Sequence, residues 1–192
     1  MSVQETLRDL IKIPSYSGQE KAVQSHIGHF FSQNHIESFK QGPNVIVHMR
    51  GKDETSAFIF NAHVDVVDAG DESKWTHNPW SGDIDGNRMF GRGTSDMKSG
   101  VAASMEVAKA LAAKDSLPCD AWFTYVVREE TDGAGTQSFA EWFKEKRYVD
   151  QYKNVVVVFG EPTGLDTAQY GHRGNFFIKA EANGDAGSRF QS

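Results

Sequence analysis

A histidine and an aspartate two residues apart follow an apolar run in the segment I-F-N-A-H-V-D-V-V-D. His63 and Asp65 stand where a stretch with the composition of a β-strand comes to its end. In an extended backbone residues i and i+2 share a face, so the imidazole and the carboxylate can point the same way. One of them can bind a metal ion while the other holds or backs it. A histidine and an aspartate at this spacing usually lie in a solvated turn when no other motif accompanies them. Their interpretation therefore depends on the motifs that follow.

Two further apolar runs also end in carboxylates. The run 119–127 leads into Glu129 and Glu130, and the run 154–159 leads into Glu161. In open α/β sheets the functional site forms at the carboxyl ends of the strands, so these side chains are expected to meet the histidine. Charged residues are common in loops, and that is the competing explanation. Three successive strand ends with metal-ligand side chains favour a metal site.

A glycine-rich turn supplies one more acidic residue. The segment G-R-G-T-S-D-M-K-S-G, residues 91–100, brackets Asp96 with glycines that allow a sharp turn and a close approach of the backbone. A phosphate cradle is the rival interpretation. It fails because neither glycine-rich nucleotide-binding pattern is present and because Asp96 would repel a phosphate unless a metal intervened.

The elements that must position these residues can be traced along the chain. Apolar residues at helical spacing predict a short opening helix that Pro14 ends. A second helix is expected to begin with a capping box of Ser17 and Glu20 and to run out near Asn34. Strands are predicted at 44–49, 57–62, 119–127 and 154–159, and helices at 101–113 and around Phe139, Trp142 and Phe143.

This alternation of strands and helices predicts an α/β fold with a largely parallel sheet covered by helices. The strands are almost continuously apolar, which is typical of strands buried on both faces. With 192 residues, the chain is long enough for one substantial core, or for one domain and the beginning of another.

Composition narrows the class of protein. The formal charge of −6, without a cluster of basic residues, argues against nucleic acid as the partner. A single cysteine, Cys119, excludes an internal disulfide framework. No apolar stretch approaches the length of a membrane span, and the polar N-terminus does not resemble a signal peptide. We therefore expect a soluble cytoplasmic enzyme.

One histidine and several carboxylates without a thiolate suit zinc, cobalt or manganese. The groups are too many for one ion, whereas two ions about 3.5–4 Å apart, sharing a carboxylate and a water, would use them all. Asp96 is the best candidate for the shared carboxylate. Because Glu129 and Glu130 are neighbours, their side chains diverge in extended geometry, so one can bind metal while the other acts as general base.

Four ordered motifs carry a family resemblance: H-V-D, G-R-G-T-S-D-M-K-S-G, E-E and G-E-P-T. They resemble the co-catalytic zinc deacylases and exopeptidases, which include succinyl-diaminopimelate desuccinylase, acetylornithine deacetylase, aminoacylase and glutamate carboxypeptidase. The resemblance implies a sheet of the zinc aminopeptidase-like type and two zinc ions. It also implies roles for the individual side chains: His63 and Glu161 bind one zinc, Glu130 binds the other, Asp96 bridges them, Glu129 is the general base and Asp65 orients His63.

The resemblance also sets expectations for the backbone and for the extent of the chain. Similar enzymes have a cis peptide bond after the bridging aspartate, so Asp96–Met97 is expected to be cis. They are about twice as long, so residues 1–175 are expected to form the N-terminal part of the catalytic domain and 176–192 to begin a lid or dimerisation segment. The family's last zinc ligand, a distant histidine, has no counterpart, and the lid motif that normally contains a histidine has none at 184–189.

The expected function is zinc-dependent removal of an N-acyl group, acetyl or succinyl, from an amino acid. Two alternatives remain: a dipeptidase or carboxypeptidase of the same family, or a catalytically silent metal-binding or interaction fragment. The expected partners are a small N-acyl amino acid or short peptide, with neither nucleic acid nor membrane. The full-length parent is expected to be a homodimer and this chain a monomer.

Overall fold

The computed structural model describes residues 2–164 and 166–171. The chain divides into two compact units, of which the first ends at Pro162 and contains every predicted site residue. The expected lid segment 176–192, with its stretch 184–189, lies outside the described residues, and a domain boundary near residue 175 stays a prediction. Within the described part of the chain, no helix has both the length and the apolar character needed to span a membrane.

Two helices open the chain. α1 (Val3–Ile11) begins with a capping box in which the side chains of Ser2 and Glu5 accept from each other's backbone amides, and it ends ahead of Pro14 as predicted. α2 (Lys21–Gln33) ends directly before Asn34, where its end was predicted.

The predicted capping box at the start of α2 is wrong. No side-chain hydrogen bond caps this helix, and Glu20 occupies the N-cap position. Ser17 Oγ instead donates to the Asp65 carboxylate at 2.7 Å. Glu20 Oε1 accepts from the backbone amides of Gly18 and Arg128. Both side chains can form either a local bond or a bond to a distant group, and here they bond groups near the ends of two strands.

A five-stranded sheet in the order β1-β2-β6-β3-β7 forms the centre of the fold. β3 (Gly51–His63) runs parallel to both of its neighbours, β6 (Leu117–Val126) and β7 (Asn154–Phe159). β1 (Phe39–Gln41) and β2 (Asn44–Met49) add an antiparallel hairpin beside β6. The predicted α/β class with a largely parallel sheet is confirmed, and the hairpin is the departure from it.

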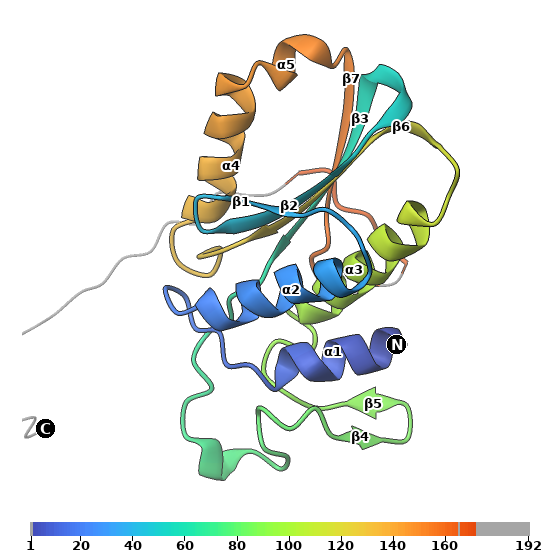
Figure 1. Ribbon diagram of the computed structural model, residues 1–192. Helices are drawn as coiled ribbons and strands as arrows, with labels where there is room; N and C mark the ends of the chain where they lie inside the picture. The colour runs from blue at the N-terminus through green and yellow to red at the C-terminus, as the bar shows by residue number, and fades with distance from the viewer. Residues whose placement is uncertain (1, 165, 172–192) are drawn as a thin grey trace, which may run out of the picture. The chain divides into compact units, whose positions relative to one another are not determined.

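Helices cover both faces of the sheet (Figure 1). α2 and α3 (Lys98–Ala112) pack on one face, in a core cluster that includes Phe123 and Tyr125 of β6. α4 (Ala134–Glu145) lies on the other face, where a second cluster surrounds Trp122. The side chains of β6 thus alternate between the two clusters, as the pleat of a strand requires.

The remaining elements lie in the connections. The long connection from β3 to α3 contains a 3-10 helix (Glu72–Lys74) and a small hairpin of β4 (Ile84–Asp85) and β5 (Arg88–Met89). A short helix, α5 (Tyr148–Gln151), follows α4, and its Tyr148 packs against the cluster around Trp122.

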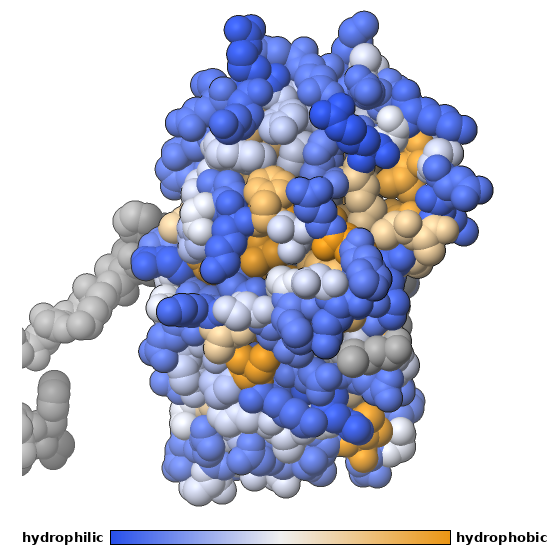
Figure 2. All heavy atoms as spheres, in the orientation of Figure 1, coloured by the Kyte–Doolittle hydropathy of each residue, from blue (hydrophilic) through white to orange (hydrophobic). Residues whose placement is uncertain are grey.

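β7 is an edge strand whose apolar side chains are exposed, which contradicts the prediction that all strands are buried. Its four consecutive valines, residues 155–158, are between 38% and 59% exposed. Among the described residues, β3 is its one partner in the sheet. Figure 2 shows apolar surface in the upper half of the molecule, over the region where Figure 1 draws the sheet. An apolar run therefore predicted the strand correctly but not its burial.

The difference in burial between strands predicts different responses to one substitution. Val156 is 59% exposed and Val47 of β2 is fully buried. Val47→Thr places a hydroxyl in the core and should lower the free energy of unfolding by about 1–3 kcal/mol. Val156→Thr keeps the β-branched shape in solvent and should change it by less than about 0.5 kcal/mol. Urea unfolding of both variants measures the difference, and equal losses would show that β7 is covered in solution.

Candidate metal centre

The parallel pairing of three strands brings the predicted site residues to one edge of the sheet. His63, the last residue of β3, lies opposite Val126 at the end of β6. On the other side, Asn61 lies opposite Phe159 at the end of β7, two residues before Glu161. Since all three strands run in the same direction, the segments that follow them emerge at the same edge.

His63, Asp96 and Glu161 form a compact cluster at this edge. The imidazole Nε2 of His63 lies 3.1 Å from Asp96 Oδ1 and 3.8 Å from Glu161 Oε1. One ligand atom from each residue lies within 4.8 Å of the other two. One nitrogen and two carboxylate oxygens at this spacing suit a divalent ion such as zinc or manganese. The structure therefore brings together three of the four predicted ligands.

The ring of His63 is held in one orientation. It is only 1% exposed, and its Nδ1 atom lies 3.0 Å from the backbone carbonyl oxygen of Asp65 and 3.4 Å from that residue's Oδ1. A proton on Nδ1 leaves Nε2 free to face the cluster, the arrangement that commonly orients a metal-binding histidine. Asp65 thus orients His63 through its backbone carbonyl as well as its carboxylate, and the resemblance alone did not indicate the carbonyl.

The turn that carries Asp96 depends on glycines. The Asp96–Met97 peptide bond is cis, as expected. Gly93 has a φ of +83°, and a Cβ atom there would lie 2.6 Å from the side chain of Val66. At Gly100, near the start of α3, a Cβ atom would lie 2.6 Å from the carbonyl oxygen of Gly160. The absence of a side chain at residue 100 therefore lets α3 approach the residue that precedes Glu161.

The acidic turn after β6, which contains Glu129 and Glu130, is hydrogen-bonded to Asp65. The backbone amides of Glu129 and Glu130 donate to the two carboxylate oxygens of Asp65, each at 3.1 Å. The Glu129 carboxylate lies 3.8 Å from His63 Nε2. Glu130 lies outside the three-residue cluster, so its role as a ligand stays a prediction. The structure places both glutamates at the correct edge without distinguishing the ligand from the base.

Burial and the surrounding negative charges shift the pKa values of the residues at this site. Burial would lower the pKa of His63, but the hydrogen bond to Asp65 and the charges of Glu161 and Glu129 outweigh burial and raise it to about 9. Burial raises the pKa of Glu161 to about 7, with further contributions from the negative charges of Asp96 and Glu129. Burial and Asp96 also raise the pKa of Glu130. In the metal-free protein His63 is therefore protonated at pH 7, and Glu161 is about half protonated.

Lys98 is a residue near the site that sequence reasoning missed. Its side chain is fully buried, and its ammonium donates to the carbonyl oxygens of Leu10 and Ile13 at 3.0 and 2.7 Å. Burial lowers the pKa of Lys98 to about 7. Lys98 is part of the glycine-rich motif 91–100, but nothing in that motif indicated that the lysine bonds backbone carbonyls at the end of α1.

An open groove of about 360 Å³ lies next to the acidic turn, and Glu130 is one of its lining residues. Tyr16 and Val67 contribute apolar surface to it, while Gln19 and Asp68 contribute polar groups. None of the three cluster residues lines this groove, so a small substrate bound in it would lie against Glu130 of the acidic turn.

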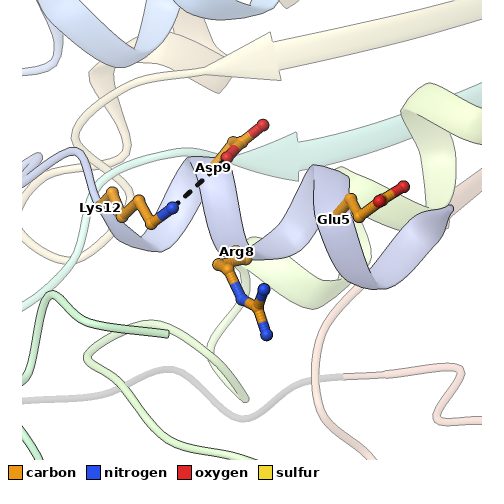
Figure 3. Close-up of a pocket in the computed structure, with 4 residues that line it drawn as sticks. All are labelled: Glu5, Arg8, Asp9 and Lys12. Carbon is orange, nitrogen blue, oxygen red and sulfur yellow. Dashed lines mark ion pairs between the residues drawn. The ribbon is translucent and has the colours of Figure 1, made fainter. Parts of the chain in front are cut away.

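A larger hollow of about 480 Å³ lies along α1 (Figure 3). Its lining residues are Glu5, Arg8, Asp9 and Lys12, and the last two form an ion pair at 3.8 Å. None of the cluster residues lines it. Acids and bases simply alternate along one helix face there, which is usual for an exposed helix, and we assign this hollow no function.

Together, the fold and the site define an α/β protein with a histidine and carboxylate cluster at the carboxyl edge of its sheet. Comparison with known proteins agrees with this class. Residues 59–176 match the family described as Peptidase family M20/M25/M40. That match covers more than half of the chain, so the chain belongs to this family.

Relatives and solved structures support the same assignment. The chain is 30% identical to succinyl-diaminopimelate desuccinylase of Ehrlichia ruminantium over 94% of its own length and 49% of the relative's. It is 33% identical to the enzyme of that name from Paracoccus denitrificans, over 71% of this chain and 36% of the relative. The chain thus spans about half the length of the first of these relatives.

Two solved structures show the same fold. A metallo-carboxypeptidase from Sulfolobus solfataricus superposes with a TM-score of 0.65 at 21% identity, over 82% of this chain and 37% of that one. Human carnosine dipeptidase 1 superposes with a TM-score of 0.66 at 19% identity, over 81% of this chain and 38% of that one.

The raised pKa values predict that binding a divalent ion displaces protons. At pH 7 His63, with a pKa of about 9, is protonated, and Glu161, with a pKa of about 7, is half protonated. A metal ligand must be deprotonated, so uptake at pH 7 should release between about one and two protons. The apparent affinity should therefore rise with pH between 6 and 9. Calorimetric titration with Zn²⁺ in buffers of different ionisation enthalpy measures the number released.

Variants of the cluster provide the control for this titration. His63→Ala removes the group with the highest pKa and should lower both the affinity and the number of protons released. Asp96→Ala should lower the affinity. Unchanged binding in the double variant would rule out this cluster as the metal site.

Proposed function

We propose that this chain is part of a two-metal amide hydrolase, which removes an N-acyl group, acetyl or succinyl, from an amino acid. The observation that carries the proposal is the cluster of His63, Asp96 and Glu161 in a chain of the M20/M25/M40 family. Zinc is the proposed metal, with cobalt or manganese as alternatives that the same ligands accept. A Bacillus subtilis protein of similar fold is described as a dinuclear metal-binding peptidase, with a TM-score of 0.57 at 18% identity.

The proposed roles follow the family resemblance. His63 and Glu161 hold one ion and Glu130 the other, with Asp96 between them. The 3.1 Å and 3.8 Å separations from His63 Nε2 to Asp96 and Glu161 support the first ion. For the second ion, the support is that the negative charge of Asp96 contributes to the raised pKa of Glu130.

When bound, the metal pair polarises the amide carbonyl and makes a water molecule more acidic. Glu129 accepts a proton from the attacking water and returns it to the departing amine. Its carboxylate lies 3.8 Å from His63 Nε2, close enough to reach groups held at the cluster. Asp65 orients His63 and holds the amide of Glu129, so it positions the ligand and the base together.

The relatives favour an N-acyl amino acid as substrate. Proteins named succinyl-diaminopimelate desuccinylase reach 30–33% identity, whereas the structures named for carboxypeptidase and dipeptidase activity reach 21% and 19%. A dipeptidase or carboxypeptidase activity is the second candidate, because both structures share the fold. We further propose a cytoplasmic location and a homodimer for the full-length protein.

Substitutions at Glu129 and Glu130 test the proposal. Glu129→Gln should keep the metal and lower turnover of an N-succinyl or N-acetyl amino acid by a factor on the order of 10²–10⁴, because it removes a general base. Glu130→Gln should weaken metal binding. Metal content by elemental analysis and product release by amine detection, with the protein loaded with zinc, provide the two measurements.

The same experiment separates the alternatives. Metal binding without turnover in the unsubstituted protein would support a silent metal-binding fragment. Faster cleavage of a dipeptide than of an N-acyl amino acid would support a peptidase. An interchange of the two variants' phenotypes would exchange the proposed roles of Glu129 and Glu130.

A further inference from the structure

The segment between α1 and α2 contacts the residues that follow β3 and those that follow β6. Ser15 Oγ donates to the carbonyl oxygen of Val64 at 2.7 Å, and its own carbonyl accepts from Val66 at 2.9 Å. At the other end of the segment, Glu20 Oε1 accepts from the backbone amide of Arg128, two residues beyond the end of β6, at 3.2 Å. This segment therefore holds the ends of β3 and β6 in a fixed relation.

Asp65 lies at the centre of these contacts. Its carboxylate is fully buried. Oδ1 accepts from the amide of Glu129 at 3.1 Å and lies 3.4 Å from His63 Nδ1. Oδ2 accepts from the amide of Glu130 at 3.1 Å and from Ser17 Oγ at 2.7 Å. A buried carboxylate needs such donors, and the bond from Ser17 is the shortest of the set.

The backbone of the acidic turn depends on this carboxylate. Arg128 has a φ of +61°, a left-handed conformation that is uncommon outside glycine. Its amide donates to Glu20 Oε1 at 3.2 Å, so the residue at the N-cap of α2 also holds the start of the turn. Glu129 and Glu130 lie in a turn directly after Arg128, and the conformation of this turn depends on Asp65 because its carboxylate accepts from both amides.

We propose that Ser17 is a positioning residue of the metal centre. Its hydroxyl fixes the rotation of the Asp65 carboxylate, so that the two oxygens of Asp65 hold the amides of Glu129 and Glu130 and thereby aim both side chains. Without this hydroxyl, Oδ2 keeps one donor and the carboxylate can turn toward other partners. The inference rests on the proposed function in one respect: the aimed groups are taken to be the base and a ligand.

Ser15 provides a matched control for a purely structural effect. It lies in the same segment and has a buried hydroxyl that donates to a backbone carbonyl, with no bond to Asp65. Ser15→Ala therefore removes the same atom and one hydrogen bond from the same connection. Ser17→Thr keeps the hydroxyl and should rescue what Ser17→Ala loses.

The first measurement needs no metal. In the full chain, hydrogen exchange of individual amides is followed by NMR. Ser17→Ala should accelerate exchange at Glu129 and Glu130 by about tenfold or more, because both amides lose a fixed acceptor. Ser15→Ala and Ser17→Thr should change exchange at these two amides by less than about threefold.

The second measurement is titration with Co²⁺, followed by its visible absorption. Ser17→Ala should weaken Co²⁺ binding by about 10- to 100-fold, the range for loss of a group that supports a ligand. Ser15→Ala and Ser17→Thr should bind like the unsubstituted protein. If Ser17→Ala does not fold, Ser17→Cys replaces it, because the thiol is close in size and a weaker donor.

Equal effects of Ser15→Ala and Ser17→Ala on the two amides, or no rescue by Ser17→Thr, would overturn the proposal. The two measurements distinguish failure of the Ser17 proposal from failure of the proposed function. If the unsubstituted protein binds no Co²⁺, the metal site is wrong, while the exchange rates still decide whether Ser17 positions the acidic turn.

Discussion

The parallel pairing of β3 with both β6 and β7 is the constraint on which the candidate site depends. His63 ends β3, and its register opposite Val126 sets how far the acidic turn lies from the imidazole. Side chains alternate along a strand, so a slip of one residue would turn His63 to the other face of the sheet. Two core clusters on opposite faces oppose such a slip, because it would also exchange the faces of Ile59 and Phe60 in β3.

Strand positions could be predicted because short apolar runs were bounded by polar or glycine residues. The bounds of β2 and β7 match the prediction, and both begin with an asparagine. Strand ends predicted that His63 and Glu161 meet, the glycine-rich turn added Asp96, and the three residues do lie together. The predictions that held combine a local pattern with one general rule, that sites form at the carboxyl ends of parallel strands.

The predictions that failed concern competition between local and distant partners. Ser17 and Glu20 have the spacing of a capping box, but they bond Asp65 and Arg128, which lie far along the chain. Spacing describes only the local option. The apolar run of β7 likewise predicts a strand but does not say whether it lies at the centre or the edge of the sheet. Strand order depends on how the helical connections pass over the sheet, and periodicity carries no information on that.

The charged groups at the site lower the stability of the metal-free fold. The pKa values of His63 and Glu161 lie above their ordinary values of 6.5 and 4.5. A raised pKa means that the folded state binds the proton more tightly, so its contribution to stability is lost as pH rises through about 7 for Glu161 and about 9 for His63. At high pH the carboxylates repel one another around a neutral imidazole. Neutral side chains at these strand ends would avoid the repulsion, so the need for a cation at this edge accounts for the residues better than the need to fold does.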